Sequence, residues 1–344
     1  CTLAIMIAIA GYLSSPPLSE RRLFSDQGSH IAAALSIWYD HDLEYTLGDL
    51  ERFRKAMPAV PGPQGAFLKV GTNGHLYYAK PFLYAFISSP FVAIFGLVGF
   101  FIFNELCFIA IGIVAIGVLI NHFGQLNALL ITIGLLLFSP FIAWTPVAHP
   151  DLFIAALVVL GGFLLLKQDY SSAWRAIGAM LLGLVIYEKP PFILLVVPMF
   201  IVLYNTISMR LFAIFVTTTY FAWQLPSAIN ILQDGNIIAY EGLRFYVRGT
   251  LGSFPLEKGW PGPPHENLLD HIFTASTFIN AVTSNWILMP SKFADALFGR
   301  QTGLILYFPF TLILLGMTLY RVSWRGTIIV LGLLTYLIIE WMVF

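Results

Sequence analysis

The chain has 344 residues, of which 58% are hydrophobic and only 10% are charged, and its mean hydropathy is +0.81. Soluble domains carry about a quarter charged residues, so this composition excludes an ordinary water-soluble domain and favours an integral membrane protein. The 18 basic residues balance 18 acidic ones, so no net charge points to nucleic acid as a partner.

Apolar runs that approach the roughly 20 residues needed to cross the hydrocarbon core recur along the chain. They are solidly apolar and do not alternate, which favours helices over the strands of a membrane barrel. The runs cover residues 1–16, 79–98, 100–120, 126–144, 151–166, 174–187, 190–204, 211–226, 303–320 and 327–344. We therefore predict an all-α, polytopic transmembrane bundle with about 9–10 membrane segments.

Two long polar stretches, rich in Gly, Pro, Tyr and Trp, interrupt the apolar runs. We expect a single transmembrane domain with a first helix at 1–16, a first outer loop with interfacial helices at 17–78, a helical core at 79–226, a second outer loop at 227–302 and last helices at 303–344. The sequence starts without Met inside one apolar run and ends inside another, so we expect it to be part of a longer protein.

Short basic loops predict the orientation, because Lys and Arg mark the cytoplasmic side of a membrane. The short loops at 167–175, 205–210 and 321–325 carry such residues. Successive crossings counted from these loops place the turn at 145–151 and the break at 187–191 together on the opposite, outer side.

The first long loop shares the outer side only if the run at 79–98 dips into the membrane without crossing it, or if the first run is not a normal span from inside to outside. Pro81 and Pro90 favour the dip, because proline destabilises a continuous helix. Both long loops, the turn and the break then face outward together.

Polar residues at the expected outer boundary are candidates for a functional site. Asp26 follows the first helix and precedes an apolar stretch, so it is either a catalytic carboxylate or the N-cap of a helix. Lys80, preceded by aromatic Tyr78, either holds a lipid phosphate at headgroup depth or belongs to an aromatic belt with a snorkelling lysine.

Further candidates lie in the outer turn and the break. His149 and Asp151 either recruit a metal together with Asp26, or Asp151 caps the following helix. Glu188 and Lys189 join two short apolar runs, and such interrupted helices often mark binding sites at membrane depth; the alternative is a mutual ion pair. Arg300, at the exit of the second loop, either binds a phosphate or anchors the chain at the lipid headgroups. The intramembrane carboxylate Glu105 is a further candidate binding residue.

The order of these features resembles the polyprenyl-phosphate-dependent GT-C glycosyltransferases, most closely the aminoarabinose transferase and protein O-mannosyltransferase group. The features are an Asp-containing first outer loop, Lys80-Pro81 leading into the membrane, an acidic outer turn, and Lys189 after a short helix. The resemblance covers roughly residues 1–205. It departs from the family where Gln27 follows Asp26 and Pro190 follows Lys189.

The resemblance implies an inverting glycosyltransferase of a bacterial inner or plasma membrane, with its active site on the extracytoplasmic face. Asp26 would be the general base, and Lys80, Lys189 and Arg300 would bind the phosphate of a polyprenyl-phosphate sugar. The acceptor would be an extracytoplasmic glycan, lipid or protein. No cofactor is required, although a divalent metal is compatible with the scheme.

A flippase or transporter for a lipid-linked sugar is the alternative, because interrupted helices and intramembrane charges also serve translocation. No internal repeat relates the two halves of the chain, and the polar residues gather on one side. Both features favour the enzyme.

Overall fold

The structure, a computed structural model, describes residues 26–58, 66–137, 139, 141–235, 239, 242–247 and 268–273. The predicted helices at 1–16, 303–320 and 327–344, Arg300 and most of the second long loop lie outside these residues. The described helices are α2 (Gln27–Tyr39), α3 (Leu47–Ala56), α4 (Leu83–Phe95), α5 (Val98–Phe123), α6 (Gln125–Leu137), α7 (Phe141–Trp144), α8 (Asp151–Leu166), α9 (Ser172–Glu188), the 3-10 helix η2 (Pro190–Phe192), α10 (Ile193–Tyr204) and α11 (Met209–Asp234).

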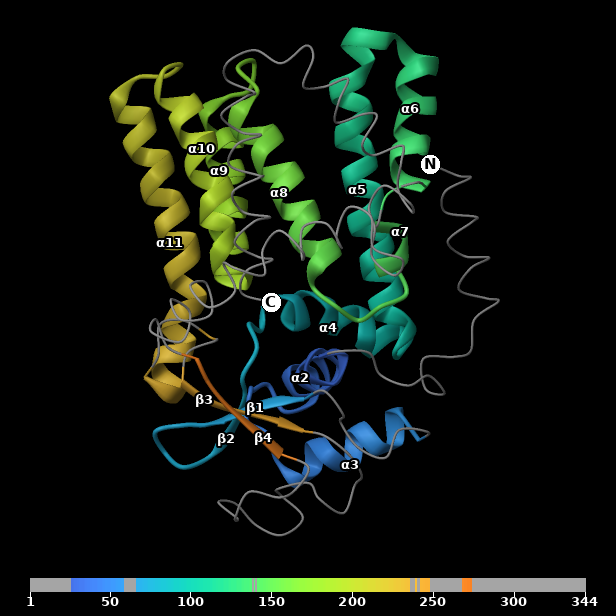
Figure 1. The fold of residues 1–344 in the computed structure, drawn as a ribbon, viewed down its shortest axis with the longest axis vertical. Coiled ribbons are helices and arrows are strands. Elements are labelled where there is room, and N and C mark those ends of the chain that lie inside the picture. The colour runs from blue at the N-terminus through green and yellow to red at the C-terminus, as the bar shows by residue number, and fades with distance from the viewer. Residues whose placement is uncertain are drawn as a thin grey trace, which may run out of the picture.

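The longer helices form a bundle, and different connections lie at its two ends (Figure 1). In this bundle, α9 packs against both α8 and α11, and α5 packs against α6 and α8. The connections between α8 and α9 and between α10 and α11 lie at the upper end in Figure 1, and the turn before α8 and the break after α9 lie at the lower end. The basic loops at 167–175 and 205–210 therefore lie at the opposite end from the turn at 145–151 and the break at 187–191, as the loop count predicts, while the basic loop at 321–325 lies outside the described residues.

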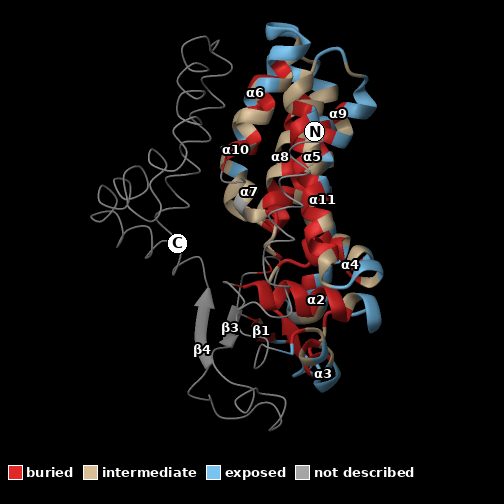
Figure 2. Ribbon diagram, turned by 90° about the vertical axis from the view of Figure 1, so that its right-hand side faces the viewer, coloured by how far each residue is buried: buried red, intermediate tan, exposed pale blue. Residues whose placement is uncertain are grey.

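Helices α2 and α4 lie across the lower end of the bundle instead of along it (Figures 1 and 2). They pack against each other, and α4 also packs against α5. At 13 residues, α4 is about 20 Å long and too short to cross a hydrocarbon core of about 30 Å. The dip of the run at 79–98 into a membrane stays a prediction, and the length of α4 is compatible with it.

A small sheet makes the prediction of an all-α fold wrong in one respect. Strands β1 (Phe67–Val70), β2 (Leu76–Tyr78), β3 (Gly242–Val247) and β4 (Leu268–Phe273) are antiparallel and lie in the order β2-β1-β3-β4. Because β1 comes from the first long loop and β3 from the second, their pairing joins the two loops at the lower end of the bundle.

Two of the predicted apolar runs differ in their bounds from the helices of the structure. The run at 126–144 is not one helix, since α6 ends at Leu137 and the short α7 begins at Phe141. The run at 211–226 continues through Pro226 to Asp234 as α11.

Helix length and composition identify one candidate membrane span in the described part of the chain. Among the described residues, α5 is the one helix of at least 18 residues that is apolar enough to cross a bilayer, while α4, α6, α8 and η2 with α10 are apolar but shorter. These dimensions establish a mainly helical protein with one candidate membrane span.

Candidate functional site

Asp26 lies immediately before α2 and is the centre of a group of charged side chains. It occupies the N-cap position of α2, yet its side chain makes no capping hydrogen bond. Lys80 Nζ lies 2.6 Å from Asp26 Oδ2, and His149 Nε2 lies 2.9 Å from Asp26 Oδ1. The carboxylate is thus directed at residues from other segments, which decides against the interpretation of Asp26 as a simple helix cap.

His149 lies between two carboxylates. Its Nδ1 atom is 3.3 Å from Asp151 Oδ2, and Asp151 Oδ1 in turn is 3.8 Å from Lys189 Nζ. The contacts of His149 are ion pairs and not aligned hydrogen bonds, because neither His149 Nδ1 nor Asp26 Oδ1 has a hydrogen-bond partner with suitable geometry. Successive contacts therefore connect Lys80, Asp26, His149, Asp151 and Lys189, and the charges alternate in sign along this series. We call these five residues the charged row.

Electrostatic coupling fixes the ionisation of this row. Burial by itself would raise the pKa of Asp26, but His149 and Lys80 outweigh it and hold the pKa far below its usual range. Burial would lower the pKa of His149, but its contacts with Asp151 and Asp26 raise it to about 9. Near neutral pH, Asp26 is therefore an anion and His149 is a cation.

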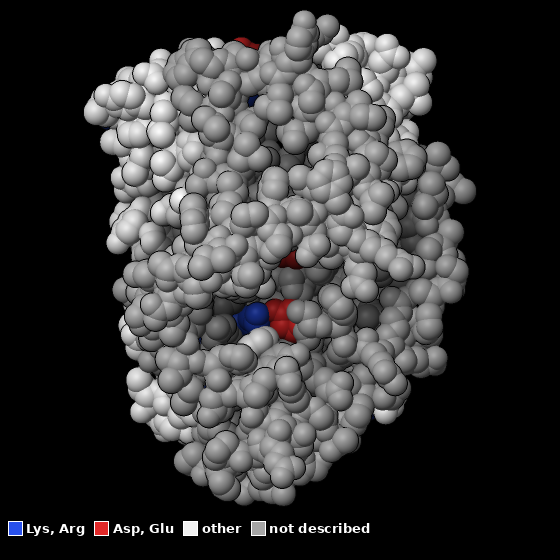
Figure 3. Space-filling view, viewed as in Figure 1, with Lys and Arg blue, Asp and Glu red and all other residues white. Residues whose placement is uncertain are grey.

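The residues of the charged row come from segments that are far apart in the sequence. These segments are the start of α2, the turn before α4, the turn before α8 with the first residue of α8, and the break after α9. Figure 3 shows basic and acidic side chains next to each other in a hollow of the face that is viewed in Figure 1. Of the nine site residues predicted from sequence, five form this single group.

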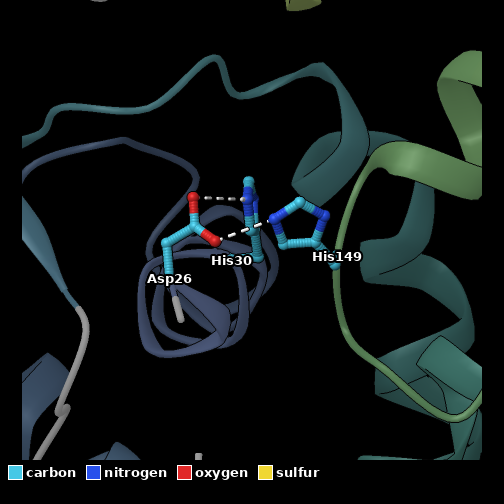
Figure 4. A group of neighbouring side chains, drawn as sticks. All are labelled: Asp26, His30 and His149. Carbon is cyan, nitrogen blue, oxygen red and sulfur yellow. Dashed lines mark ion pairs between the residues drawn. The ribbon is translucent and has the colours of Figure 1, made fainter. Parts of the chain in front are cut away.

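His30 belongs to the site but was not among the predicted residues. It follows Asp26 by one helical turn, and its Nε2 atom is 4.0 Å from Asp26 Oδ2 (Figure 4). The side chain is 2% exposed, and its ring contacts Tyr84 edge-on. Burial lowers the pKa of His30 to about 3 although Asp26 opposes this shift, so His30 is neutral. The Asp-x-x-x-His spacing on one helix face was the signal that could have revealed it.

The other predicted residues lie elsewhere. Glu188 is 1% exposed, and its Oε1 accepts a hydrogen bond of 2.8 Å from the backbone N–H of Tyr84, so it connects the end of α9 to the first turn of α4. Tyr78 is buried against the ring of Tyr45. Glu105 is buried in α5, and its carboxylate has no hydrogen-bond partner in the described part of the chain. Among the described residues, no ion pair joins Tyr78 or Glu105 to the charged row.

Asn104 is a second residue that the sequence did not reveal, and it holds the turn that carries His149. Its side chain is fully buried. Its Nδ2 donates to the backbone carbonyl groups of Val147, Thr145 and Trp144, at 2.7, 3.2 and 3.4 Å. Its Oδ1 accepts from the hydroxyl of Tyr84 at 3.2 Å.

We expect Asn104→Ala to lower the free energy of unfolding by about 1–2 kcal/mol, because it leaves buried carbonyl groups without a donor. Asn205→Ala is the matched control, because that exposed side chain also donates to one backbone carbonyl group, of Ile201, and should change stability by less than about 0.5 kcal/mol. Thermal unfolding of both variants in detergent measures the difference. Equal melting temperatures would contradict the role given to Asn104.

Comparison of the chain with protein-family models, with curated proteins and with solved structures finds no match in any of the three. Function must therefore be inferred from the chemistry of the charged row and its surroundings.

Proposed function

We propose that the protein is a multi-pass membrane glycosyltransferase that transfers a sugar from a polyprenyl phosphate to an acceptor hydroxyl with inversion. The observation that carries this proposal is the charged row, in which Lys80 contacts the buried carboxylate of Asp26 and Lys189 contacts the carboxylate of Asp151. A general base next to cations that bind phosphate is what a displacement at a sugar phosphate needs.

The outward faces of the bundle support a membrane location with several crossings. Large apolar side chains on α5, α6, α10 and α11 are 49–76% exposed, namely Ile113, Leu126, Val197, Phe221 and Leu225. A helix bundle in water would present polar residues at such positions, whereas lipid tails solvate apolar ones. The charged row then lies at the end of the bundle that faces away from the cytoplasm.

The proposed reaction is a single displacement. The oxygen of the acceptor attacks the anomeric carbon of the donor sugar as Asp26 takes the hydroxyl proton, and the bond from that carbon to the phosphate oxygen breaks. The lipid phosphate leaves with one more negative charge than it had in the donor. Lys80 and Lys189 stabilise that developing charge electrostatically, and inversion follows from attack on the face opposite the leaving group.

The contact between Lys80 and Asp26 has a role in this scheme. Together with His149, Lys80 keeps Asp26 ionised but makes the carboxylate a weak base. When Lys80 turns to the donor phosphate, Asp26 loses a cationic neighbour and becomes a stronger base. Donor binding thereby activates the base.

Transfer from a radiolabelled polyprenyl-phosphate sugar by the purified full chain in lipid nanodiscs tests the proposal. Labelled acceptor with inverted configuration at the anomeric carbon is the expected product. A flippase would instead move the intact labelled lipid between the leaflets of a liposome without consuming it. Absence of donor consumption with a panel of such sugars, together with lipid movement, would overturn the proposal.

A further inference from the structure

Asp26, His30 and His149 bring three potential metal ligands together at one buried point. Each contributes one ligand atom, and these atoms all lie within 4.8 Å of one another. Two imidazoles and one carboxylate are a ligand set typical of zinc and similar divalent ions, with a fourth position left open. Figure 4 shows both imidazole rings directed at the carboxylate of Asp26, His30 from the first turn of α2, which Asp26 precedes, and His149 from the turn before α8.

A buried nitrogen without a hydrogen bond at this point indicates that a ligand completes it. His30 Nε2 is buried and has no hydrogen-bond partner within the described residues, whereas Asp26 Oδ1 has the ion-pair contact with His149 Nε2. Water does not supply the missing hydrogen bond of His30 Nε2, because the side chain is only 2% exposed. Such atoms are rare in proteins and need a physical explanation.

The spacing of the ligand atoms suits a tetrahedral ion. Zinc bonds of about 2.0–2.1 Å to nitrogen and oxygen place neighbouring ligand atoms about 3.3 Å apart. His149 Nε2 is 2.9 Å from Asp26 Oδ1, and His30 Nε2 is 4.0 Å from Asp26 Oδ2. These two distances lie on either side of that spacing, and the three ligand atoms all lie within 4.8 Å of one another.

His149 also has a carboxylate beside the ring nitrogen that would not bind the ion. His149 Nδ1 faces Asp151 Oδ2 at 3.3 Å, which leaves Nε2 on the side of Asp26. Metal-binding histidines usually direct the nitrogen that does not bind metal at a carboxylate or carbonyl group, which fixes the orientation of the ring. Asp151 supplies that carboxylate for His149.

We infer that Asp26, His30 and His149 form a binding site for a divalent ion of the zinc class, in competition with the ammonium group of Lys80. Lys80 Nζ lies 2.6 Å from Asp26 Oδ2, so it already neutralises the carboxylate that the ion would use. Its long flexible side chain allows it to withdraw when the ion binds. Ion binding here does not depend on the proposed sugar transfer.

Titration calorimetry of the chelator-stripped full chain in detergent with ZnCl₂ tests the site, and the visible absorption of bound Co²⁺ reports its geometry. His30→Gln and His149→Gln should weaken binding by more than the roughly 10- to 100-fold expected for Asp151→Asn, which removes only an outer partner. Lys80→Met should tighten binding, because the competing cation is gone. His122→Gln, at an exposed histidine of α5, is the control and should bind like the wild type.

Retained folding is checked by thermal unfolding, and Gln preserves much of the volume of His30. No zinc binding by the stripped wild type would overturn the inference. Equal binding by the wild type, His30→Gln and His149→Gln would do so as well, because it would place the ion on other histidines. Unchanged or weaker binding by Lys80→Met would refute the competition.

Discussion

Asp26→Asn should reduce the rate of sugar transfer by about 10²- to 10⁴-fold, the usual contribution of a general base. Asparagine has nearly the same shape as aspartate but cannot accept the proton of an attacking hydroxyl. The loss should fall on kcat. The KM for the donor should not rise, because the substitution removes the partner of Lys80 and leaves that lysine more available to phosphate.

This pattern separates a catalytic role of Asp26 from a structural one. Loss of the charge also removes a buried partner from Lys80 and His149, so thermal unfolding must show that the variant is folded at the assay temperature. Asp169→Asn is the matched control, because Asp169 is exposed in the connection between α8 and α9, at the opposite end of the bundle. Transfer by Asp26→Asn within tenfold of the wild-type rate would mean that another group is the base.

The helical part of the fold is predictable because apolar runs are a local signal. The run at 151–166 has the same bounds as α8, and the run at 190–204 has the bounds of η2 with α10. Pro190 and Pro191 mark the break after α9, whereas Pro90 lies inside α4 and does not end it. Pro226 did not end α11, because neighbouring groups can compensate for one missing hydrogen bond inside a long helix.

The sheet was not predictable, since it depends on contacts between distant segments. Leu68 of β1 pairs with Phe245 of β3, and periodicity within either short strand does not identify its partner. The same limit applies to the site. Loop counting placed the turn before α8 and the break after α9 on one side, but it gave no distances.

His30 and Asn104 were missed for a related reason. A histidine or asparagine inside an apolar stretch is usually a core residue that has a hydrogen-bond partner, and only the folded arrangement shows what it faces. Asn104 holds the turn before α8 from inside α5, a pairing across about 40 residues that no local pattern indicates. Glu188, by contrast, was identified as a binding residue but connects two helices.

The close packing of α9 against α11 depends on Gly183. A Cβ atom at this position would lie 2.2 Å from the backbone oxygen of Thr219 and 2.7 Å from Ala222 Cβ, far inside normal contact. The absence of a side chain brings the helices close enough for the hydroxyl of Thr219 to donate to the carbonyl of Ala179 at 2.9 Å. Small residues allow this kind of close approach between helices in membranes.

Gly183→Ala should therefore lower the free energy of unfolding by about 1–3 kcal/mol, and Gly183→Leu by more, because the clash is with backbone that must move as a whole. Gly117→Ala is the matched control, since its added Cβ would lie 3.9 Å from Phe163 Cζ and helix propensity should make it neutral or stabilising by about 0.5–1 kcal/mol. Melting temperatures in detergent compare the two. Because α9 ends at the break that carries Lys189, a displaced α9 should also weaken donor binding. A Gly183→Ala variant as stable as Gly117→Ala would show that α9 and α11 do not pack this closely.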